Sequence, residues 1–498
     1  MNLNDFPDKV LCQIFDHLDL YEVKLASRVC RRWSTLTFSE RRMDRVFLKP
    51  SYSNSDFLLN TKRNYRNFRQ LWNEDDNHQF SSLVWLQRKL KPNVRVLDIL
   101  TDVTSEQLRL LLVEAPELQH LSISVITYCN CGTSGPFPVL PKLTSLKLIQ
   151  SQDDRFDFLR KSMPNLQSLN MSCASDSELK VWRHFSKQLK LANVHAFLSK
   201  YIDPFLELTF PLLEDLSMNK DNWPMLVQLD SGKSHDFFQR HPLLRKLSIR
   251  IDIPLECVES ITRHCPELTY LHLNLNNPEE GFLKSLEQLT KLKHLSIDEP
   301  EDAGGYMEIL AQLTGLRHLS VQGGMDRKMF RGDLKALEIV ELKVRRPGVL
   351  LENLFEVAPQ LNSLKLKHGN HDHLQLQFIC ENFSYLQHLE VNVKEVIAAD
   401  NSVPFDGLAL QELKISWATK INYIHHKTLR CLTISYSEIT DDDLNKIPGK
   451  FPLLKRLSLV SCSKVSMTGV KRLHKLMGSC RIDYDKKRFY PVKDDSSK

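Results

Sequence analysis

The sequence contains few glycines and no long apolar run. Only 16 of its 498 residues are glycine, so loops of the kind that cradle phosphates are scarce. No stretch of about 18 apolar residues occurs, which is the length that a membrane-spanning helix needs. The opening decapeptide MNLNDFPDKV also lacks a basic region followed by an apolar stretch. We therefore expect neither a secretory signal nor a membrane segment.

Cysteines are scattered rather than arranged in a framework. The closest two of the 11 are Cys129 and Cys131. An odd number without regular spacing is typical of reduced thiols inside the cell. This pattern predicts a protein of the cytoplasm, the nucleus or both.

Signatures of catalysis are missing. The sequence has no H-E-x-x-H, no P-loop, no dinucleotide-binding glycine motif and no G-x-S-x-G turn. The segment HGNHDH brings together His368, His371, Asp372 and His373, but this spacing fits no zinc-ligand pattern. We expect no enzymatic activity, no metal and no cofactor.

Charges of the two signs are nearly balanced. Lys and Arg number 67 against 61 Asp and Glu, a formal net charge of +6. Over this length the excess does not by itself indicate a nucleic-acid or membrane partner. The chain is also too long for one ordinary core, so it contains several domains or a core that grows lengthwise.

A leucine-rich phrase, Pro-x-Leu-x-x-Leu-x-apolar, returns along most of the chain. Clear copies are Pro116 to Ile123, Pro266 to Leu273 and Pro452 to Leu459. Its first apolar residues lie at positions 94, 118, 143, 166, 189, 213, 244, 268, 292, 316, 339, 361, 386, 410, 429 and 454. The spacing is close to 24 residues, which indicates an internal structural repeat.

Each unit combines strand and helix signals. Alternating residues such as Leu121 and Ile123 predict a short strand with one buried face. Between strands, Leu108, Leu111 and Leu112 follow helical spacing, and Thr104 with Gln107 has the form of a capping box. Such a unit cannot bury its apolar face alone, so neighbouring units must stack.

Over residues 93 to 480 this pattern resembles the leucine-rich-repeat family. The resemblance implies an α/β fold, a curved solenoid with parallel strands on its concave side and helices or irregular segments on its convex side. Leu457, Leu459, Cys462 and Val465 resemble the cysteine-containing repeats that are common in F-box proteins.

Residues 1 to 47 follow a different, helical rule. Pro7 suits a helix start, and the next residues form one apolar stripe. The stripe holds Val10, Leu11, Ile14, Phe15 and Leu18. A second apolar face holds Val23, Ala26, Val29, Cys30 and Trp33. About 40 residues rarely fold unaided, so this unit needs a partner surface.

The same segment closely resembles the F-box motif. It contains Phe6-Pro7, Ile14-Phe15, Leu18, the run Val29-Cys30-Arg31-Arg32-Trp33, and Leu36. Phe6 replaces the usual leucine. The resemblance implies contact with an SKP-type adaptor, through residues drawn from Phe6, Pro7, Val10, Leu11, Ile14, Phe15, Leu18, Val23, Ala26, Val29 and Trp33. Some of these, Trp33 above all, are alternatively expected to hold the box itself together.

Two segments remain outside both patterns. Residues 48 to 92 are polar and aromatic, and we interpret them as a linker with divergent capping repeats, since terminal repeats are atypical. Residues 481 to 498 are charged, which favours a C-terminal tail.

Residues between the repeat leucines point to the concave face. One candidate substrate-binding group is Tyr270, His272, His294 and His318. Another is basic and consists of Lys343, Arg345, Lys365, Lys367 and Lys414. The first four of these, Lys343, Arg345, Lys365 and Lys367, are expected on two adjacent strands, where they would repel one another and favour an acidic or phosphorylated partner. A plain solvated face is the alternative.

The combination implies the substrate-recognition subunit of an SCF-type ubiquitin ligase. By this resemblance the F-box binds an SKP-type adaptor and, through it, a cullin scaffold, while the repeats hold a substrate protein. Two rival functions are a non-degradative F-box and leucine-rich-repeat interaction protein, and a solenoid that binds nucleic acid through its basic strands.

Overall fold

The computed structural model describes residues 3–18, 20–44, 46–48, 65–70, 94–127, 136–151, 157–196, 199–220, 229–275, 285–298, 313–322, 334–343, 348–371, 373–393, 405–418, 424–485 and 487–489. The chain forms two compact units. Unit 1 is Met1–Leu213 with Lys220–Met225, and unit 2 is Glu214–Asn219 with Leu226–Lys498. Each unit is described by itself.

Unit 1 begins with the short helices that the sequence predicts. They are η1 (Leu3–Asp5), α1 (Asp8–Asp16), α2 (Leu20–Ala26), α3 (Arg31–Thr37) and α4 (Glu40–Met43). Pro7 sits immediately before α1, and its carbonyl accepts the first helical hydrogen bonds, from the amides of Val10 and Leu11 at 3.0 and 3.1 Å. Cys30 caps α3, since its Sγ accepts from the Trp33 amide.

A ladder of parallel strands follows in unit 1. It consists of β1 (Phe47–Leu48), β2 (Asn67–Gln70), β3 (Val96–Thr104), β4 (His120–Thr127), β5 (Ser145–Ser151), β6 (Ser168–Ser172) and β7 (Leu191–Ala196). The intervening helices are α7 (Ser105–Val113), α8 (Asp157–Ser162), α9 (Asp176–Phe185) and α10 (Ser199–Leu206). The predicted capping box of Thr104 and Gln107 is confirmed at the start of α7.

The segment between residues 48 and 92 joins the helices to this ladder. Its described part includes β2, which pairs in parallel with both β1 and β3. Asp44, next to α4, forms ion pairs with Arg66 at 3.0 Å and with Arg95 at 3.3 Å. The N-terminal helices are therefore tied to the first repeats by both strand pairing and charge.

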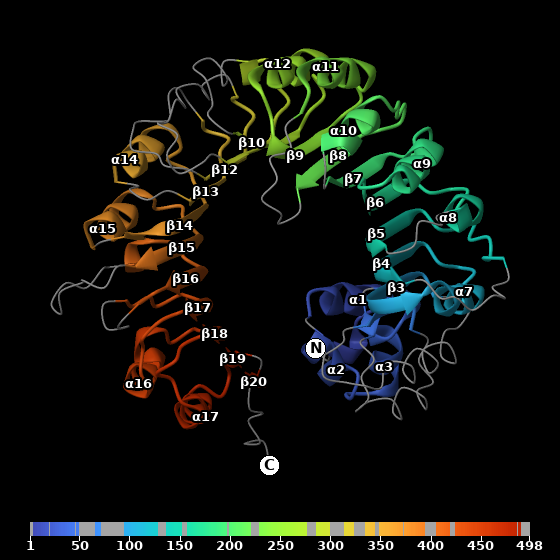
Figure 1. The fold of residues 1–498 in the computed structure, drawn as a ribbon. Coiled ribbons are helices and arrows are strands. Elements are labelled where there is room, and N and C mark those ends of the chain that lie inside the picture. Colours follow the sequence, from blue (N-terminus) through green and yellow to red (C-terminus); the bar gives the residue numbers. More distant parts are fainter. Residues whose placement is uncertain are drawn as a thin grey trace. The chain divides into compact units, whose positions relative to one another are not determined.

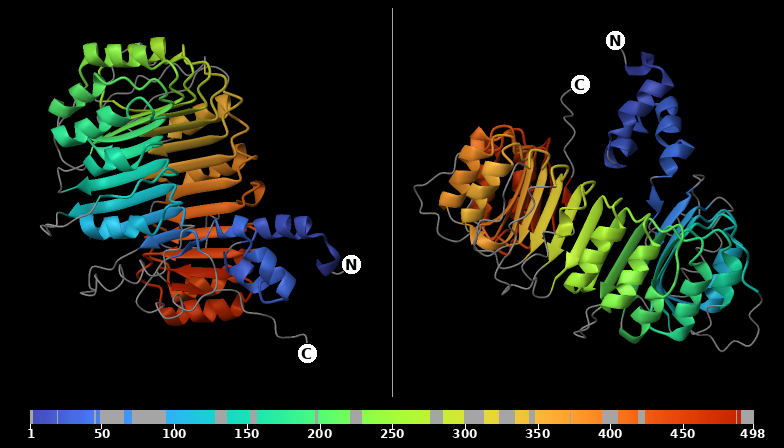
Figure 2. Two further views of the ribbon diagram at one scale, coloured as in Figure 1. Left: turned by 90° about the vertical axis from the view of Figure 1, so that its right-hand side faces the viewer. Right: turned by 90° about the horizontal axis from the view of Figure 1, so that it is seen from above.

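Unit 2 contains the longer ladder. Its parallel strands are β8 (Asp215–Lys220), β9 (Lys246–Asp252), β10 (Tyr270–Asn274), β11 (His294–Asp298), β12 (His318–Gln322), β13 (Ile339–Lys343), β14 (Ser363–His371), β15 (His388–Val393), β16 (Glu412–Ser416), β17 (Cys431–Ser435), β18 (Arg456–Val460) and β19 (Arg481–Tyr484). The helices α11 (Ser231–Arg240), α12 (Leu255–His264), α14 (Gly348–Val357), α15 (His373–Asn382), α16 (Asp441–Lys450) and α17 (Met467–Leu476) lie along the outer side of these strands (Figures 1 and 2). A 3-10 turn, η3 (Phe405–Gly407), takes the helix position in one repeat.

Register explains why the leucine phrase repeats. Leu247, Leu271, Leu295 and Leu319 are paired across β9 to β12, and all are buried. Side chains alternate along a strand, so the residues on either side of each leucine face outward on the strand side. The stacked repeats bury a continuous row of leucines, which a single repeat could not bury by itself.

Two expectations about boundaries are wrong. The unit placed at 339 is shifted by two residues, because Ile339 pairs with His318 and the buried residue equivalent to the other markers is Leu337. The predicted tail from 481 instead begins with β19, which buries Ile482 and pairs antiparallel with β20 (Lys487–Phe489). Alternation within RIDY is enough to continue the ladder despite the surrounding charge.

Candidate functional site

The first candidate surface lies on the N-terminal helices, where the apolar stripe of α1 divides into two edges. Leu11 and Phe15 are buried and form a small core with Ala26, against which Phe6, Leu18, Trp33 and Leu36 pack. Phe15 and Trp33 meet edge to face with ring centroids 4.9 Å apart. The sequence prediction therefore needs correction for Leu11, Phe15 and Ala26, which hold this domain together from inside.

The other edge of the stripe faces outward. Pro7 is exposed, Ile14 is 38% exposed, and Val29, between α2 and α3, is 58% exposed. Val10 and Val23 are half-buried. Leu3 is also exposed, and sequence reasoning missed it because it precedes the periodic stripe. Large apolar side chains left in water on so small a domain mark it as an interaction surface.

Two arginines fix the shape of this surface, and neither was predicted to do so. Arg32 donates to the carboxylate of Asp8 at 2.8 Å and to the carbonyls of Asn4 and Phe6 at 2.5 and 2.7 Å. Arg42 donates to the carbonyl of Cys12 and lies 5.2 Å from the centre of the Phe15 ring. These bonds hold α3 and α4 against the start of the chain.

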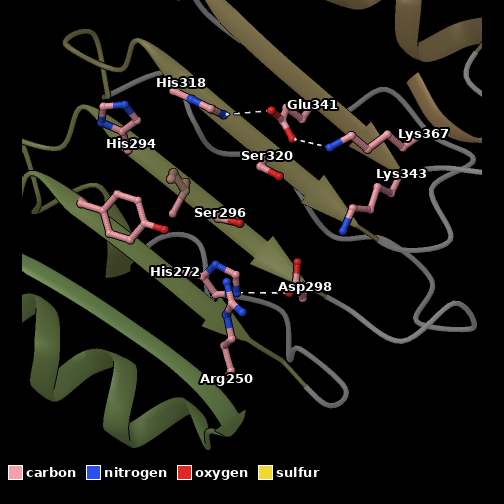
Figure 3. Close-up of a pocket in the computed structure, with 12 residues that line it drawn as sticks. Arg250, His272, His294, Ser296, Asp298, His318, Ser320, Glu341, Lys343 and Lys367 are labelled. Carbon is pink, nitrogen blue, oxygen red and sulfur yellow. Dashed lines mark hydrogen bonds and ion pairs between the residues drawn. The ribbon is translucent and has the colours of Figure 1, made fainter. Parts of the chain in front are cut away.

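The second candidate surface is a pocket on the strand side of unit 2 (Figure 3). Its volume is about 330 Å³, and residues of β9 to β14 line it. The lining includes Tyr270, His272, His294, His318, Lys343 and Lys367, so the whole first predicted group meets two members of the basic group in one pocket. It also includes Arg250, Leu295, Ser296, Asp298, Ser320 and Glu341.

Aromatic rings form one row of the pocket. Tyr270, His294 and His318 are paired on adjacent strands, with ring centroids 5.9 and 5.3 Å apart. Partial burial, with the ammonium groups of Lys246 and Lys293 nearby, lowers the pKa of His294. Burial also lowers the pKa of His318 although Glu341 opposes it. Both imidazoles are therefore neutral near pH 7.

A histidine and a carboxylate form the next contact. His272 lies 3.1 Å from Asp298 through its Nε2 atom (Figure 3). Burial alone would raise the pKa of Asp298, but the hydrogen bond from His272, with Lys343 and Arg250 nearby, lowers the pKa overall. Asp298 is thus ionised and already partnered at neutral pH.

Glu341 changes the interpretation of the basic group. Its carboxylate accepts hydrogen bonds from Lys365 and, at 3.1 Å, from Lys367. Burial raises the pKa of Glu341, but the two lysines outweigh it and lower the pKa overall. Glu341 alternates with Lys343 along β13 and therefore faces the same side, but the sequence prediction left it out. The expected cluster of mutually repelling cations is therefore wrong for this pair of lysines.

The other predicted cations differ in position. Lys343 donates to Gln322 at 2.6 Å, and Lys414 pairs with Glu412 at 3.3 Å, away from the pocket lining. Arg345 lies outside the described residues. Among the lining residues, the cations Arg250, Lys343 and Lys367 oppose the anions Asp298 and Glu341, so the lysine, arginine and carboxylate charges sum to +1.

Several features of the pocket were readable only in part. Alternation along the strands places Arg250, Ser296 and Ser320 on this side, but nothing in the sequence distinguishes them from other outward residues. Within the described residues, no group of three or more His, Cys, Asp or Glu side chains could hold a metal ion, and no helix is both long and apolar enough to span a membrane.

Comparison with known proteins supports the N-terminal interpretation. Residues 3–49 match the F-box-like family model, so the chain carries an F-box-like domain, and leucine-rich repeats follow it. No curated protein matches the sequence significantly.

Solved structures similar to this chain include three that cover most of its length. An internalin from Listeria monocytogenes is 14% identical, with a TM-score of 0.33 over 74% of this chain and 86% of that one. The mouse RP105/MD-1 complex gives 15%, 0.41, 79% and 76% for the same quantities. The yeast complex of Rad7 and Elc1 gives 13%, 0.35, 94% and 96%.

Proposed function

We propose that this protein is the substrate-recognition subunit of an SCF-type ubiquitin ligase. The F-box-like domain binds an SKP-type adaptor, which links it to a cullin scaffold, and the strand side of unit 2 holds a substrate protein. The observation that carries the proposal is the outward apolar edge of Pro7, Ile14 and Val29 on a domain that matches the F-box-like family. Burial of such an edge against a partner removes apolar surface from water.

The protein itself performs no bond chemistry in this proposal. By holding a substrate near the ligase it converts an encounter between two molecules into an effectively intramolecular one. The pocket at β9 to β14 is where we place an acidic part of the substrate. Arg250 is exposed there, and within the described part of the chain it has no direct hydrogen bond or ion pair.

Substitution of the apolar edge tests the adaptor half of the proposal. The full-length variant Ile14→Glu with Val29→Glu should lose adaptor capture by about tenfold or more, because two charges would have to be desolvated at the interface. The matched control is Val113→Glu with Val139→Glu, two exposed valines in unit 1 beyond the F-box-like domain. Both variants should melt at the wild-type temperature.

Equal capture of adaptor by the two double variants would overturn the proposal. A non-degradative interaction protein is the second candidate, since the same apolar edge could serve another assembly. Affinity purification separates the two functions: a ligase subunit brings down cullin and ubiquitylated protein along with the adaptor, and the second candidate brings down neither. The third candidate is a solenoid that binds nucleic acid. Affinity for nucleic acid that falls steeply as the salt concentration rises would support that function instead.

A further inference from the structure

Two large aromatic residues lie exposed at the ends of adjacent strands in unit 2. Trp417 directly follows β16 and Tyr436 directly follows β17, and they are 56% and 53% exposed. Their rings stack, with centroids 5.4 Å apart and planes inclined by 19°. Neither the leucine core nor the pocket of Figure 3 includes them.

The backbone at these positions is left-handed. The φ angles are +66° at Trp417, +50° at Tyr436 and +54° at Ser461, the equivalent residue after β18. The amide of Trp417 donates to the carbonyl of Ser435 at 3.0 Å, and the amide of Tyr436 donates to the carbonyl of Val460 at 2.9 Å. A bulky residue rarely adopts this conformation, and glycine would relieve it. Residues in such strained backbone conformations are concentrated at functional sites, so the side chains at these positions are candidates for a function.

The third position leaves the aromatic stack open. Neighbouring strands are about 4.8 Å apart, so one step beyond Tyr436 the ladder places Ser461, an exposed residue with a small side chain. The next strand is β19, and Asp485 directly follows it; the Oδ1 atom of Asp485 accepts from the Ser461 amide at 2.9 Å. Asp485 is exposed, and in the described residues its carboxylate makes no other hydrogen bond or ion pair.

On the side of Tyr436 away from Trp417, the neighbouring strand is followed by Ser461, whose amide donates to the carboxylate of Asp485. We name the space between Tyr436, Ser461 and Asp485 the rung slot. Lys464, which follows β18, is paired with Glu438 at 2.6 Å. A planar cation fits such a slot, because one face stacks on an aromatic ring and its edge donates to a carboxylate.

We propose that the rung slot binds an arginine side chain of a partner protein. The guanidinium stacks on Tyr436 as the third rung after Trp417 and donates hydrogen bonds to Asp485. Arginine suits this geometry because its charge is planar and its donors are arranged as a fork, whereas lysine carries a compact charge that does not stack. The proposal concerns unit 2 alone and does not depend on adaptor binding.

Titration with N-acetyl-arginine amide tests the slot in the full-length protein labelled with 5-fluorotryptophan. The fluorine signal of Trp417, assigned with Trp417→Phe, should shift saturably. The citrulline analogue, which has the same shape without the charge, and the lysine analogue should bind at least about fivefold more weakly. Equal affinity for the arginine and citrulline probes, or no shift with any probe, would overturn the proposal.

Variants locate the binding. Tyr436→Ala and Asp485→Asn should each weaken arginine binding about fivefold or more. Tyr385→Ala and Asp442→Asn, which remove an exposed tyrosine and an exposed aspartate elsewhere in unit 2, should not.

Filling the slot gives an independent check. Ser461→Tyr places a ring where the equivalent positions already carry Trp and Tyr, so the melting temperature should stay unchanged while arginine binding disappears. Wild-type affinity in Ser461→Tyr, or in Asp485→Asn, would show that arginine binds elsewhere and would refute the rung slot.

Discussion

The F-box-like domain and the repeat ladder of unit 2 solve the problem of apolar burial differently. In the ladder, leucines such as Leu271 and Leu295 are buried by the neighbouring repeats on both sides. The residues that alternate with these leucines along each strand face the strand side. In the described part of the F-box-like domain, the buried core is a small cluster of Leu11, Phe15 and Ala26. The ladder completes its own core, whereas the small domain retains apolar surface for another protein.

Polar side chains show the same contrast. On the strand side of the ladder, Glu341 binds Lys365 and Lys367, and Asp298 binds His272. These contacts lie within one unit and require no partner. The difference suggests that the F-box-like domain contributes affinity through burial, while the ladder contributes selectivity through charges that a ligand must match.

The largest expected effect comes from breaking the leucine row. Leu271→Asp would place an unpaired charge in a fully buried site and should lower the free energy of unfolding by about 4 kcal/mol or more. Leu243→Asp, at an exposed position of the preceding repeat, should change it by about 0.5 kcal/mol or less. Urea denaturation measures both.

Adaptor capture by the same two variants sharpens the comparison. The F-box-like domain has its own core, so Leu271→Asp should weaken the ladder and leave capture intact. A midpoint unchanged by Leu271→Asp would contradict the continuous leucine row.

The period of the repeats predicted most of the ladder because one physical requirement, a shared leucine row, fixes each strand. It placed β10 to β12 and β14 to β18 correctly. It failed at β13, where a shorter repeat moved the register by two residues. A shift of two residues keeps each side chain on the same face, so alternation also placed Glu341 on the strand side, although it was not predicted there. Sequence spacing measures regularity, and a shortened loop breaks it without any change in residue type.

The F-box-like domain shows a different limit. Periodicity identified one apolar stripe on α1, but Leu11 and Ile14 both belong to it, and only the packing of Ala26 and Trp33 decides which is buried. The pocket was also divided between two predicted groups, since alternation gives the side of a strand and not the contacts across strands. The rung slot depends on backbone angles that no residue type there indicates.

Acid should separate the two regions. His241, in the buried part of the ladder, donates to the carbonyl of Phe237 at 2.6 Å, and burial, aided by Arg240, lowers its pKa to about 4 despite that hydrogen bond. The unfolded chain takes up the proton first, near pH 6.5. Stability is therefore full above that value and is lost as pH falls from about 6.5 toward about 4. At pH 5 the loss is about 2 kcal/mol.

Hydrogen exchange measures this loss region by region. Between pH 7 and pH 5, after correction for intrinsic rates, protection should fall in residues 229–275 and not in residues 8–37. The core of the F-box-like domain, Leu11, Phe15 and Ala26, contains no ionisable side chain. His241→Gln should flatten the pH response of the ladder. An equal loss of protection in both regions would contradict this origin.

The smallest expected effect on stability comes from unpairing the strand side itself. Glu341→Gln keeps a hydrogen-bond acceptor for Lys365 and Lys367 but removes the charge, and partly exposed pairs of this kind contribute about 1 kcal/mol or less.

The same substitution changes the sum of the lysine, arginine and carboxylate charges that line the pocket from +1 to +2. An acidic probe, a short polyglutamate peptide, should bind Glu341→Gln a few times more tightly at low salt, and the gain should shrink at high salt because screening acts within about 8 Å at physiological ionic strength. Glu412→Gln makes the same charge change beside Lys414, outside the pocket, and should leave the affinity at the wild-type value. If the two variants gained equally, overall charge rather than the pocket would govern capture, and the ladder would differ from the F-box-like domain in stability alone, without the selectivity that its paired charges suggest.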